Sequence, residues 1–460
     1  MEDNSQPQKI NICDSAADTA ANKKIKFTRE EKAWIMYDWA NSVYATIMMA
    51  AVFPIFFTNV ADAAGQQGDY WWGIGTAVAM LIVAVLAPIL GALSDFKGYR
   101  MKLFSIFFAL GVGVTFASAF FANWWLLLLG YAISHIGFSG SCLVYDSFLA
   151  EVTTSERMHK VSGYGFAMGY IGGSTIPFLV SIALIMMAET IGITVELATR
   201  ISVGLAAVWW GVFTIPFFKN IKQKYNLEKP KGQAVIGAAF KNAWLTMKKI
   251  AKNKKILFFI VAYFFYIDGV GTVINMSTAY GATLGLDTTG MILALLVTQI
   301  VAFPCSIWFS SLSNKFGSLK MIRFAVSEYL AICIVGFIMG LGLEELNYFG
   351  TGVEEEGIRI ATTMFWILAF MVGTVQGGIQ AISRSHFCQM IPPENTGEFF
   401  GFFEIFGKFA AVMGPALYAI VKGISGSSAY AILSIISLFL IGLVLLGFGN
   451  KHFKEDAKVR

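Results

Sequence analysis

Long apolar runs alternate with short polar segments along nearly the whole chain. A helix needs about 20 apolar residues to cross a bilayer, and windows of about 19 residues are suited to finding such helices. The pattern predicts twelve membrane spans, at residues 33–60, 70–93, 101–121, 124–150, 160–187, 199–218, 255–284, 288–312, 321–342, 359–388, 398–421 and 427–449. We therefore expect an all-α integral membrane protein with twelve transmembrane helices.

The longest polar interruption is a lysine-rich segment that separates six spans from six. It predicts an N-terminal tail at residues 1–32, a six-helix bundle at 33–218, a linker at 219–254, a second six-helix bundle at 255–449 and a C-terminal tail at 450–460. The N-terminal tail is polar and has no apolar segment of the kind that begins a cleavable signal peptide. We expect none.

A short internal echo supports two related halves. The pattern L-S-D-x-x-G begins at Leu93 after the second span, and L-S-N-x-x-G begins at Leu312 after the eighth. The second copy has lost the acid and kept the glycine. Transporters built from repeated halves bind substrate between them, near the middle of the membrane.

Composition agrees with a membrane protein, because the chain is 56% hydrophobic and only 14% charged. Soluble domains carry about a quarter charged residues. The net charge of +5 belongs to loops beside the membrane and gives no case for a nucleic-acid partner. The five cysteines lack metal-ligand spacing. G-x-S-x-G, H-E-x-x-H and Walker patterns are absent from the sequence. We expect no metal, no cofactor, no ATP site and no enzyme activity.

The charges also predict orientation. Of 34 lysines and arginines, only Arg200, Arg359 and Lys422 fall in the loops on one side of the predicted membrane. That side is acidic between the ninth and tenth spans, where five glutamates lie within residues 344–356. Because cytoplasmic loops are enriched in Lys and Arg, both tails and the linker are predicted to be cytoplasmic. An even number of spans requires the two tails to share a side.

Residues 91–103, between the second and third spans, have the pattern G-x-L-x-D-x-x-G-x-R-x-x-L. Gly91 and Gly98 permit a tight reversal of the chain. Asp95 can be held by a helix N-terminus or by an arginine. The segment resembles the cytoplasmic signature between helices 2 and 3 of the major facilitator superfamily. We expect Asp95 and Arg100 to latch neighbouring helix ends when the protein is closed on that side.

Charged residues inside membrane spans are costly and are functional candidates by default. Asp38, Asp146 and Arg384 lie near the predicted cytoplasmic ends of spans 1, 4 and 10. They are gating or coupling candidates, with Asp38 the first choice for a proton-sensitive group and Asp146 the second. Asp268 in span 7 and Lys408 in span 11 lie near the middle of the membrane, where transporters usually bind substrate.

Polar side chains also recur at helical spacing. Asn41 and Tyr44 share one face of span 1, and Gln376 and Gln380 form a stripe with Arg384 on span 10. These residues are expected to supply hydrogen bonds to a substrate. With Asp268 and Lys408, opposite charges could receive the ammonium and the carboxylate of a zwitterion.

Two patterns have packing explanations. Glu404 and Lys408 are four residues apart on one helix, so the two side chains could neutralise each other instead of contacting substrate. Both alternatives stay open, and Glu404 is kept among the gating candidates. Gly165, Gly169 and Gly173 lie four apart on span 5. Such small-residue stripes let a neighbouring helix approach closely, and simple packing is the main interpretation.

Two longer stretches narrow the family. Residues 37–44 are Y-D-W-A-N-S-V-Y, and residues 377–385 are G-G-I-Q-A-I-S-R-S. They resemble the vacuolar-effluxer-like branch of the major facilitator superfamily, which is related to yeast autophagy-linked amino-acid effluxers. The resemblance runs from Trp34 to about Leu446. Two positions depart from it: Ala150 stands where proline is expected, and Asp146 where asparagine is expected.

The resemblance implies a secondary transporter that works by alternating access on amino acids or similar small polar metabolites. The compact chain looks like a prokaryotic member in the plasma (inner) membrane, and we expect a monomer with a proton as candidate coupling ion. Two other functions stay open: a non-transporting receptor or scaffold, and an exporter of lipophilic compounds. The midplane charges Asp268 and Lys408 favour a transporter, because a scaffold has little reason to tolerate their cost.

Overall fold

The computed structural model describes residues 26–229, 235–344 and 354–453; the side chains of Thr288, Thr289 and residues 354–356, 408–412 and 450–453 lie outside the description. The N-terminal part consists of α2 (Arg29–Tyr44), η1 (Ala45–Ala51), α3 (Phe53–Ala63), α4 (Gly68–Ser94), α5 (Tyr99–Ser118), α6 (Trp124–Ser147), α7 (Leu149–Val152), α8 (Met158–Met168), η2 (Gly169–Thr175), α9 (Ile176–Met186) and α10 (Val195–Asn220). The C-terminal part consists of α11 (Val235–Lys252), α12 (Lys254–Thr283), α13 (Thr288–Phe316), α14 (Ser318–Glu344), α15 (Glu354–Met390), η3 (Pro393–Asn395), α16 (Thr396–Ser425) and α17 (Ser428–Phe453).

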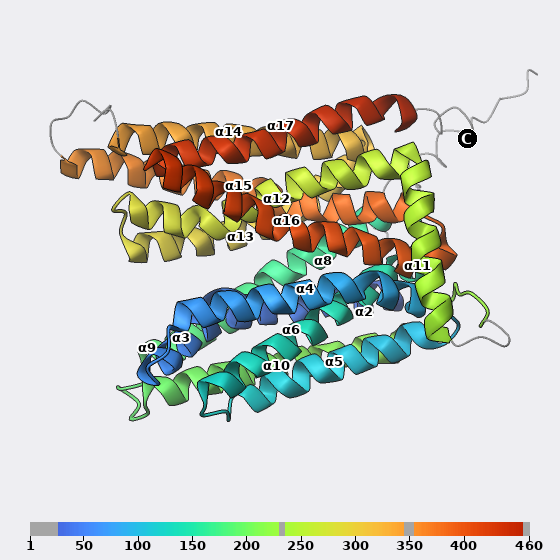
Figure 1. Ribbon diagram of the computed structural model, residues 1–460, viewed down its shortest axis with the longest axis horizontal. Coiled ribbons are helices and arrows are strands. Elements are labelled where there is room, and N and C mark those ends of the chain that lie inside the picture. The colour runs from blue at the N-terminus through green and yellow to red at the C-terminus, as the bar shows by residue number, and fades with distance from the viewer. Residues whose placement is uncertain (1–25, 230–234, 345–353, 454–460) are drawn as a thin grey trace, which may run out of the picture.

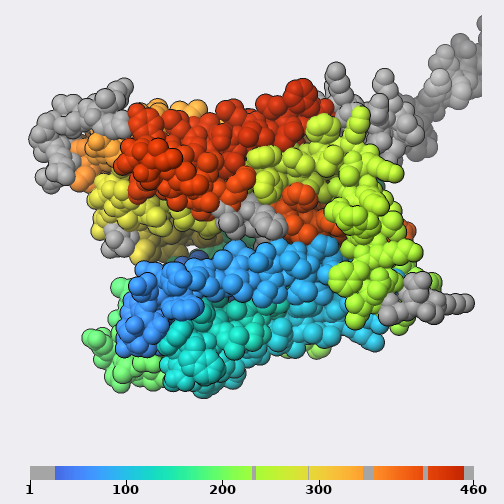
Figure 2. Space-filling view, in the orientation of Figure 1, coloured from blue at the N-terminus to red at the C-terminus, as the bar shows by residue number. Residues whose placement is uncertain are grey.

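The long helices run side by side in two groups, shown blue to green and yellow to red in Figure 1. We call α2–α10 the first group and α12–α17 the second group. The groups meet where α4 packs against α16, and where α8 packs against α13 and α15. We call the end of the bundle at which α4 gives way to α5 the signature end. Figure 2 shows the groups in contact there, beside α11, and a groove between the blue and yellow surfaces at the opposite end.

Within the described residues, eleven helical stretches are long and apolar enough to cross a membrane, and they coincide with eleven of the predicted spans. The remaining predicted span, 398–421, lies within α16. The linker 219–254 contains an element that the sequence analysis did not identify. This element is α11, which crosses the signature end and packs against α4, α12 and α16. Its lysines made the segment look like a plain polar interruption.

Spans 1 and 5 change their winding in the same way. Each has a seven-residue π-helical stretch, η1 or η2, followed by an α-helix with a proline in its first turn. Pro54 and Pro177 cannot donate the backbone hydrogen bond that would continue an α-helix. A π-helical stretch is one local adjustment to such a break, and it is frequent at functional sites. The two spans pack on each other through α2, α8 and η2.

The glycine stripe of span 5 explains how closely they pack. A Cβ atom on Gly169 would lie 2.6 Å from Ser42 Oγ, and one on Gly173 would lie 2.5 Å from Ser42 Cβ. Both distances are too short for non-bonded atoms. The packing interpretation of this stripe is therefore confirmed, with α2 as the neighbouring helix.

Candidate functional site

A buried arginine of the second group reaches two acids of the first group at the signature end. Arg384 Nη2 lies 3.1 Å from Asp38 Oδ2 on α2, and Arg384 Nη1 lies 2.9 Å from Asp146 Oδ1 on α6. Arg384 Nε donates to Ser162 Oγ on α8 at 3.0 Å. We call these four residues the Arg384 cluster. Asp38, Asp146 and Arg384 were each singled out by the sequence, and the structure brings all three together.

Aromatic rings and a glycine shape the space around this cation. The guanidinium carbon of Arg384 lies 4.6 Å from the ring centre of Trp34 and 4.4 Å from that of Phe166. Cation–π attraction therefore adds to the ion pairs. A Cβ on Gly165 would lie 2.3 Å from Asp38 Oδ2, so only glycine leaves the carboxylate its place. Gly165 thus permits the charge pairing as well as the packing of α8 on α2.

A second buried charge cluster forms at the signature loop. Arg100 donates from one terminal nitrogen to Asp95 and from the other to Glu151, and all three side chains are buried. We call these three residues the signature cluster. Burial raises the pKa of Asp95 to about 7 and also raises the pKa of Glu151, while Arg100 acts against both shifts. All three residues belong to the first group.

Asp95 also caps a helix of the second group. Its two carboxylate oxygens accept hydrogen bonds of 2.8 Å from the backbone N–H groups of Gly397 and Glu398, in the first turn of α16. These N–H groups have no partner inside the helix, and the positive end of the helix dipole favours an acid there. Asp95 therefore contacts both an arginine and a helix N-terminus, the two partners that the sequence analysis named.

Glycines let α4 and α16 touch backbone to backbone beside this cap. A Cβ on Gly91 would lie 2.1 Å from the carbonyl oxygen of Gly397. A Cβ on Gly401 would lie 2.6 Å from the carbonyl oxygen of Ala87. The contact explains why a helix N-terminus can come within reach of Asp95.

Other bonds across the two groups gather at the same end. His159 Nδ1 and Ser385 Oγ are 2.6 Å apart, Ser162 Oγ donates to the Ala381 carbonyl at 2.8 Å, and Gln389 donates to the Ser155 carbonyl at 2.7 Å. The sequence analysis missed these residues. It also missed Glu151, which lies outside the spans where it searched for charges. Serine is too common in membrane helices to have marked Ser162.

The predicted substrate residues lie in different surroundings. The Tyr44 hydroxyl is 2.8 Å from Ser134 Oγ inside the first group. Gln380 Nε2 donates to the Tyr170 hydroxyl across the two groups at 3.2 Å. Gln376 lines a mostly apolar cavity of about 110 Å³ whose lining residues all come from helices of the second group. Asn41 is buried on α2, three residues after Asp38. Their role in binding substrate stays a prediction.

The midplane charges are described only in part. Asp268 is buried, and its Oδ1 accepts a 2.9 Å hydrogen bond from the Gly414 backbone N–H on α16. Among the described residues its Oδ2 has no hydrogen-bond partner. The side chain of Lys408 lies outside the described residues, so its contact with substrate and its pairing with Glu404 both stay open. Glu404 borders a small cavity together with Ser139 of α6, across the junction of the two groups.

Comparison with known proteins identifies the family. Residues 150–456 match the family described as vacuole effluxer Atg22 like. The chain belongs to this family. It is 42% identical to an uncharacterised MFS-type transporter, YxiO, of Bacillus subtilis strain 168, over 94% of this chain and 97% of that one. It is 24% identical to autophagy-related protein 22 of Cryptococcus neoformans, over 66% of this chain and 51% of the relative. The chain therefore spans about half the length of such fungal relatives.

The vacuole effluxer-like chain also resembles solved transporters of the major facilitator superfamily. FucP in the outward conformation superposes with a TM-score of 0.63 at 15% identity, covering 93% of this chain and 99% of that one. A bacterial homologue of the iron transporter ferroportin in the outward-facing state gives 0.64 at 12% identity, covering 92% and 100%. The all-α major facilitator fold expected from the sequence is confirmed, and the chain is a membrane transporter of this superfamily. No group of three or more potential metal ligands gathers within the described residues.

Proposed function

We propose that the protein is a secondary active transporter that moves amino acids or similar small polar metabolites by alternating access. The observation that carries the proposal is the concentration of buried polar contacts between the two groups at the signature end. Such a joint closes one end of a path between the groups. The groove between the groups at the opposite end agrees with a closed signature end (Figure 2).

Opening the signature end would pull the Arg384 cluster apart. Asp38 and Asp146 would leave with the first group, and Arg384 with the second. Water entering the gap would then solvate both signs of charge. Binding of a proton to either acid in the closed state would remove one attraction to Arg384 and lower the cost of opening. This supports a proton as the coupling ion and Asp38 or Asp146 as its carrier.

The substrate class rests on the family and on chemistry. The family is described as vacuole effluxer like, and an amino acid carries both an ammonium and a carboxylate. Asp268 and Lys408 are candidates for these two groups, with Asn41, Tyr44, Gln376 and Gln380 as hydrogen-bonding candidates. We further propose that both termini lie in the cytoplasm, because the basic loops lie on one side. We also propose that the protein is a monomer in the plasma membrane.

Reconstitution into liposomes tests the function directly. Purified protein is incorporated into sealed vesicles, and a panel of labelled amino acids, sugars, organic anions and lipophilic cations is offered with and without an imposed pH gradient. We expect accumulation of one or more amino acids, faster with the gradient. Flux of lipophilic cations alone would favour the exporter alternative. Flux no faster than in protein-free vesicles, for every solute and gradient, would contradict the proposal.

A further inference from the structure

The helix α11 packs one face on both helix groups. Ala243 on this face lies in a buried cluster with Ala92 and Phe96 of the signature loop region. Three residues further along, Thr246 is buried and donates a hydrogen bond to Glu398, in the first turn of α16. The helix therefore spans the joint at which Asp95 caps α16.

The rest of α11 is divided into an apolar and a cationic side. At about 100° per residue, one sector next to the packed face carries the large apolar side chains Ile236, Phe240, Trp244 and Met247. All four are exposed, Phe240 by 54% and Trp244 by 57%. The sector beyond it carries Lys241, Lys248 and Lys252. Lys248 Nζ lies 5.2 Å from the ring centre of Trp244, at the border between the two sectors.

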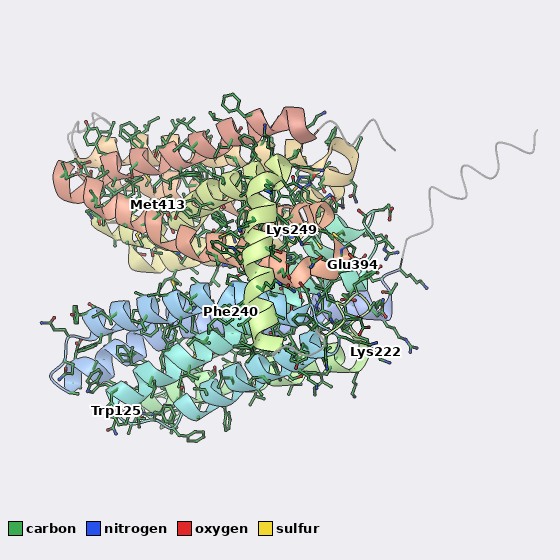
Figure 3. All side chains as sticks on the ribbon, turned by 45° about the vertical axis from the view of Figure 1, so that its right-hand side comes forward. Trp125, Lys222, Phe240, Lys249, Glu394 and Met413 are labelled. Atoms are coloured by element: carbon green, nitrogen blue, oxygen red, sulfur yellow. The ribbon has the colours of Figure 1, made fainter. Side chains whose placement is uncertain are left out.

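The position of α11 along the bundle is set by the span that follows it. The helix ends at Lys252, and Asn253 then caps α12 by accepting hydrogen bonds from the backbone of Lys255 and Ile256. One residue thus separates α11 from a membrane span, so α11 lies at the level where that span leaves the bilayer. Figure 3 shows α11 crossing the outside of the bundle, with Phe240 and Lys249 labelled along it.

We propose that the apolar sector of α11 lies in the surface of the surrounding bilayer, that its lysines bind anionic phospholipid headgroups, and that this binding holds the signature end closed. A helix with aromatic side chains on one side and lysines on the next suits the boundary between acyl chains and headgroups. Lysines at that level are attracted by anionic lipids. The last part of the proposal rests on the proposed alternating access, whereas the bilayer contact does not.

The bilayer contact is tested by measuring depth. A spin label replaces Phe240 in protein without native cysteines, in vesicles of phosphatidylcholine with and without phosphatidylglycerol. Collision with oxygen and with a water-soluble nickel complex reports the depth of the label. We expect oxygen to be favoured at position 240, and the nickel complex to be favoured at exposed position 228, the matched control. Equal nickel access at both positions would overturn the bilayer contact. Protection of position 240 that appears only at high protein density would also overturn it, by pointing to a second copy of the chain.

The coupling to the joint is tested with lipid charge. Labels at exposed positions 154 and 394 report the distance between the two groups at the signature end. We expect the closed fraction to rise with phosphatidylglycerol content, and this rise to be lost in Lys241→Gln/Lys248→Gln/Lys252→Gln. The control is Lys222→Gln/Lys315→Gln/Lys320→Gln, which removes three exposed lysines elsewhere at the same end and should keep the response. Equal responses in both triple variants would overturn the lysine role.

The two experiments distinguish failure of the bilayer contact from failure of the coupling and from failure of the proposed transport. If the protein did not transport, position 240 would still report its depth. Suppose that the label at position 240 lies in lipid, but the distance between positions 154 and 394 is the same at every lipid composition. That result would overturn the coupling and leave the bilayer contact standing.

Discussion

The two buried charge clusters at the signature end differ in how their charges are divided. In the Arg384 cluster both acids belong to the first helix group and the cation belongs to the second. In the signature cluster Asp95, Arg100 and Glu151 all belong to the first group, and within the described part of the chain the second group supplies two backbone N–H donors from α16. Separation of the groups would divide the first cluster and leave the second intact apart from its cap.

Because the charges are divided differently, the two clusters contribute differently to the stability of the closed signature end. Parting the Arg384 cluster leaves opposite charges that water must solvate separately. The cluster therefore resists opening of the signature end strongly until water or protons enter. The signature cluster keeps its ion pairs in either state and acts as a fixed mount for Asp95. Only the contact between Asp95 and α16 is made or lost. We infer that the Arg384 cluster sets most of the stability of the closed end, and the signature cluster adjusts it.

Arg384→Gln is expected to have the largest effect. It leaves Asp38 and Asp146 buried without their cation, and removal of one partner of a buried pair costs about 3–5 kcal/mol. The closed fraction, measured by the distance between labels at 154 and 394, should collapse. Arg384→Lys is the matched control: it keeps the charge but not the forked geometry, so an intermediate fraction is expected. A closed fraction like that of the unchanged protein in Arg384→Gln would contradict the dominant role of this cluster.

Gly165→Ala is expected to weaken the Arg384 cluster without changing any charge. The new methyl would lie 2.3 Å from Asp38 Oδ2 and 3.2 Å from Arg384 Nη2, and overpacking of this kind costs about 1–3 kcal/mol. Thermal unfolding and the same label distance should both show the loss. Gly204→Ala on α10, where a Cβ meets nothing within 4 Å, should be neutral or slightly stabilising. Equal behaviour of the two variants would rule out a role for Gly165 in positioning Asp38.

The sequence predicted the members of the two clusters better than it predicted their partners. Asp38, Asp146 and Arg384 stood out because charges are costly inside spans. Their meeting depends on packing between helices whose contacting residues lie 346 and 238 positions apart, and periodicity along one helix carries no such information. Tyr44 shows the same limit. It was expected to hydrogen-bond a substrate, which stays a prediction, and its hydroxyl lies 2.8 Å from Ser134 Oγ within the first group.

The fold was predictable where one physical demand dominated. Length and apolarity alone identify membrane spans, and eleven of the predicted spans coincide with apolar helices. Helix α11 satisfies several weaker demands together, because it has a packed, an apolar and a cationic side. The sequence analysis assigned the segment to a polar linker because of its lysines, although its apolar residues recur at helical spacing. Glu151 was missed because it is buried by protein contacts outside the membrane spans. Hydropathy along the chain does not report the free-energy cost of burying a charge in that way.

Asp95→Ala should shift the closed end by less than either change in the Arg384 cluster. The variant removes the cap of α16 and leaves Arg100 paired with Glu151. Loss of a helix cap costs about 0.5–2 kcal/mol. The label distance at the signature end should show a partly opened population while membrane insertion stays normal. Asp69→Ala, which removes an exposed acid at the opposite end of α4, serves as the control. A shift as large as that of Arg384→Gln would reverse the ranking of the two clusters.

An effect of similar size to loss of the cap is a pH dependence that comes from Asp95 itself. In the closed end the pKa of Asp95 is raised to about 7, whereas an exposed aspartate has a pKa of about 4. The closed state therefore holds the proton more tightly, and acidification stabilises it between these two values. Linkage then gives about a tenfold rise in the ratio of closed to open molecules when the pH falls from about 8 to about 6. In Asp95→Asn, which cannot titrate, this component should vanish, and any remaining pH dependence belongs to other groups such as Asp38 and Asp146. The label distance measured across this pH range in both proteins decides the matter: identical pH curves would show that Asp95 does not change its protonation when the signature end opens.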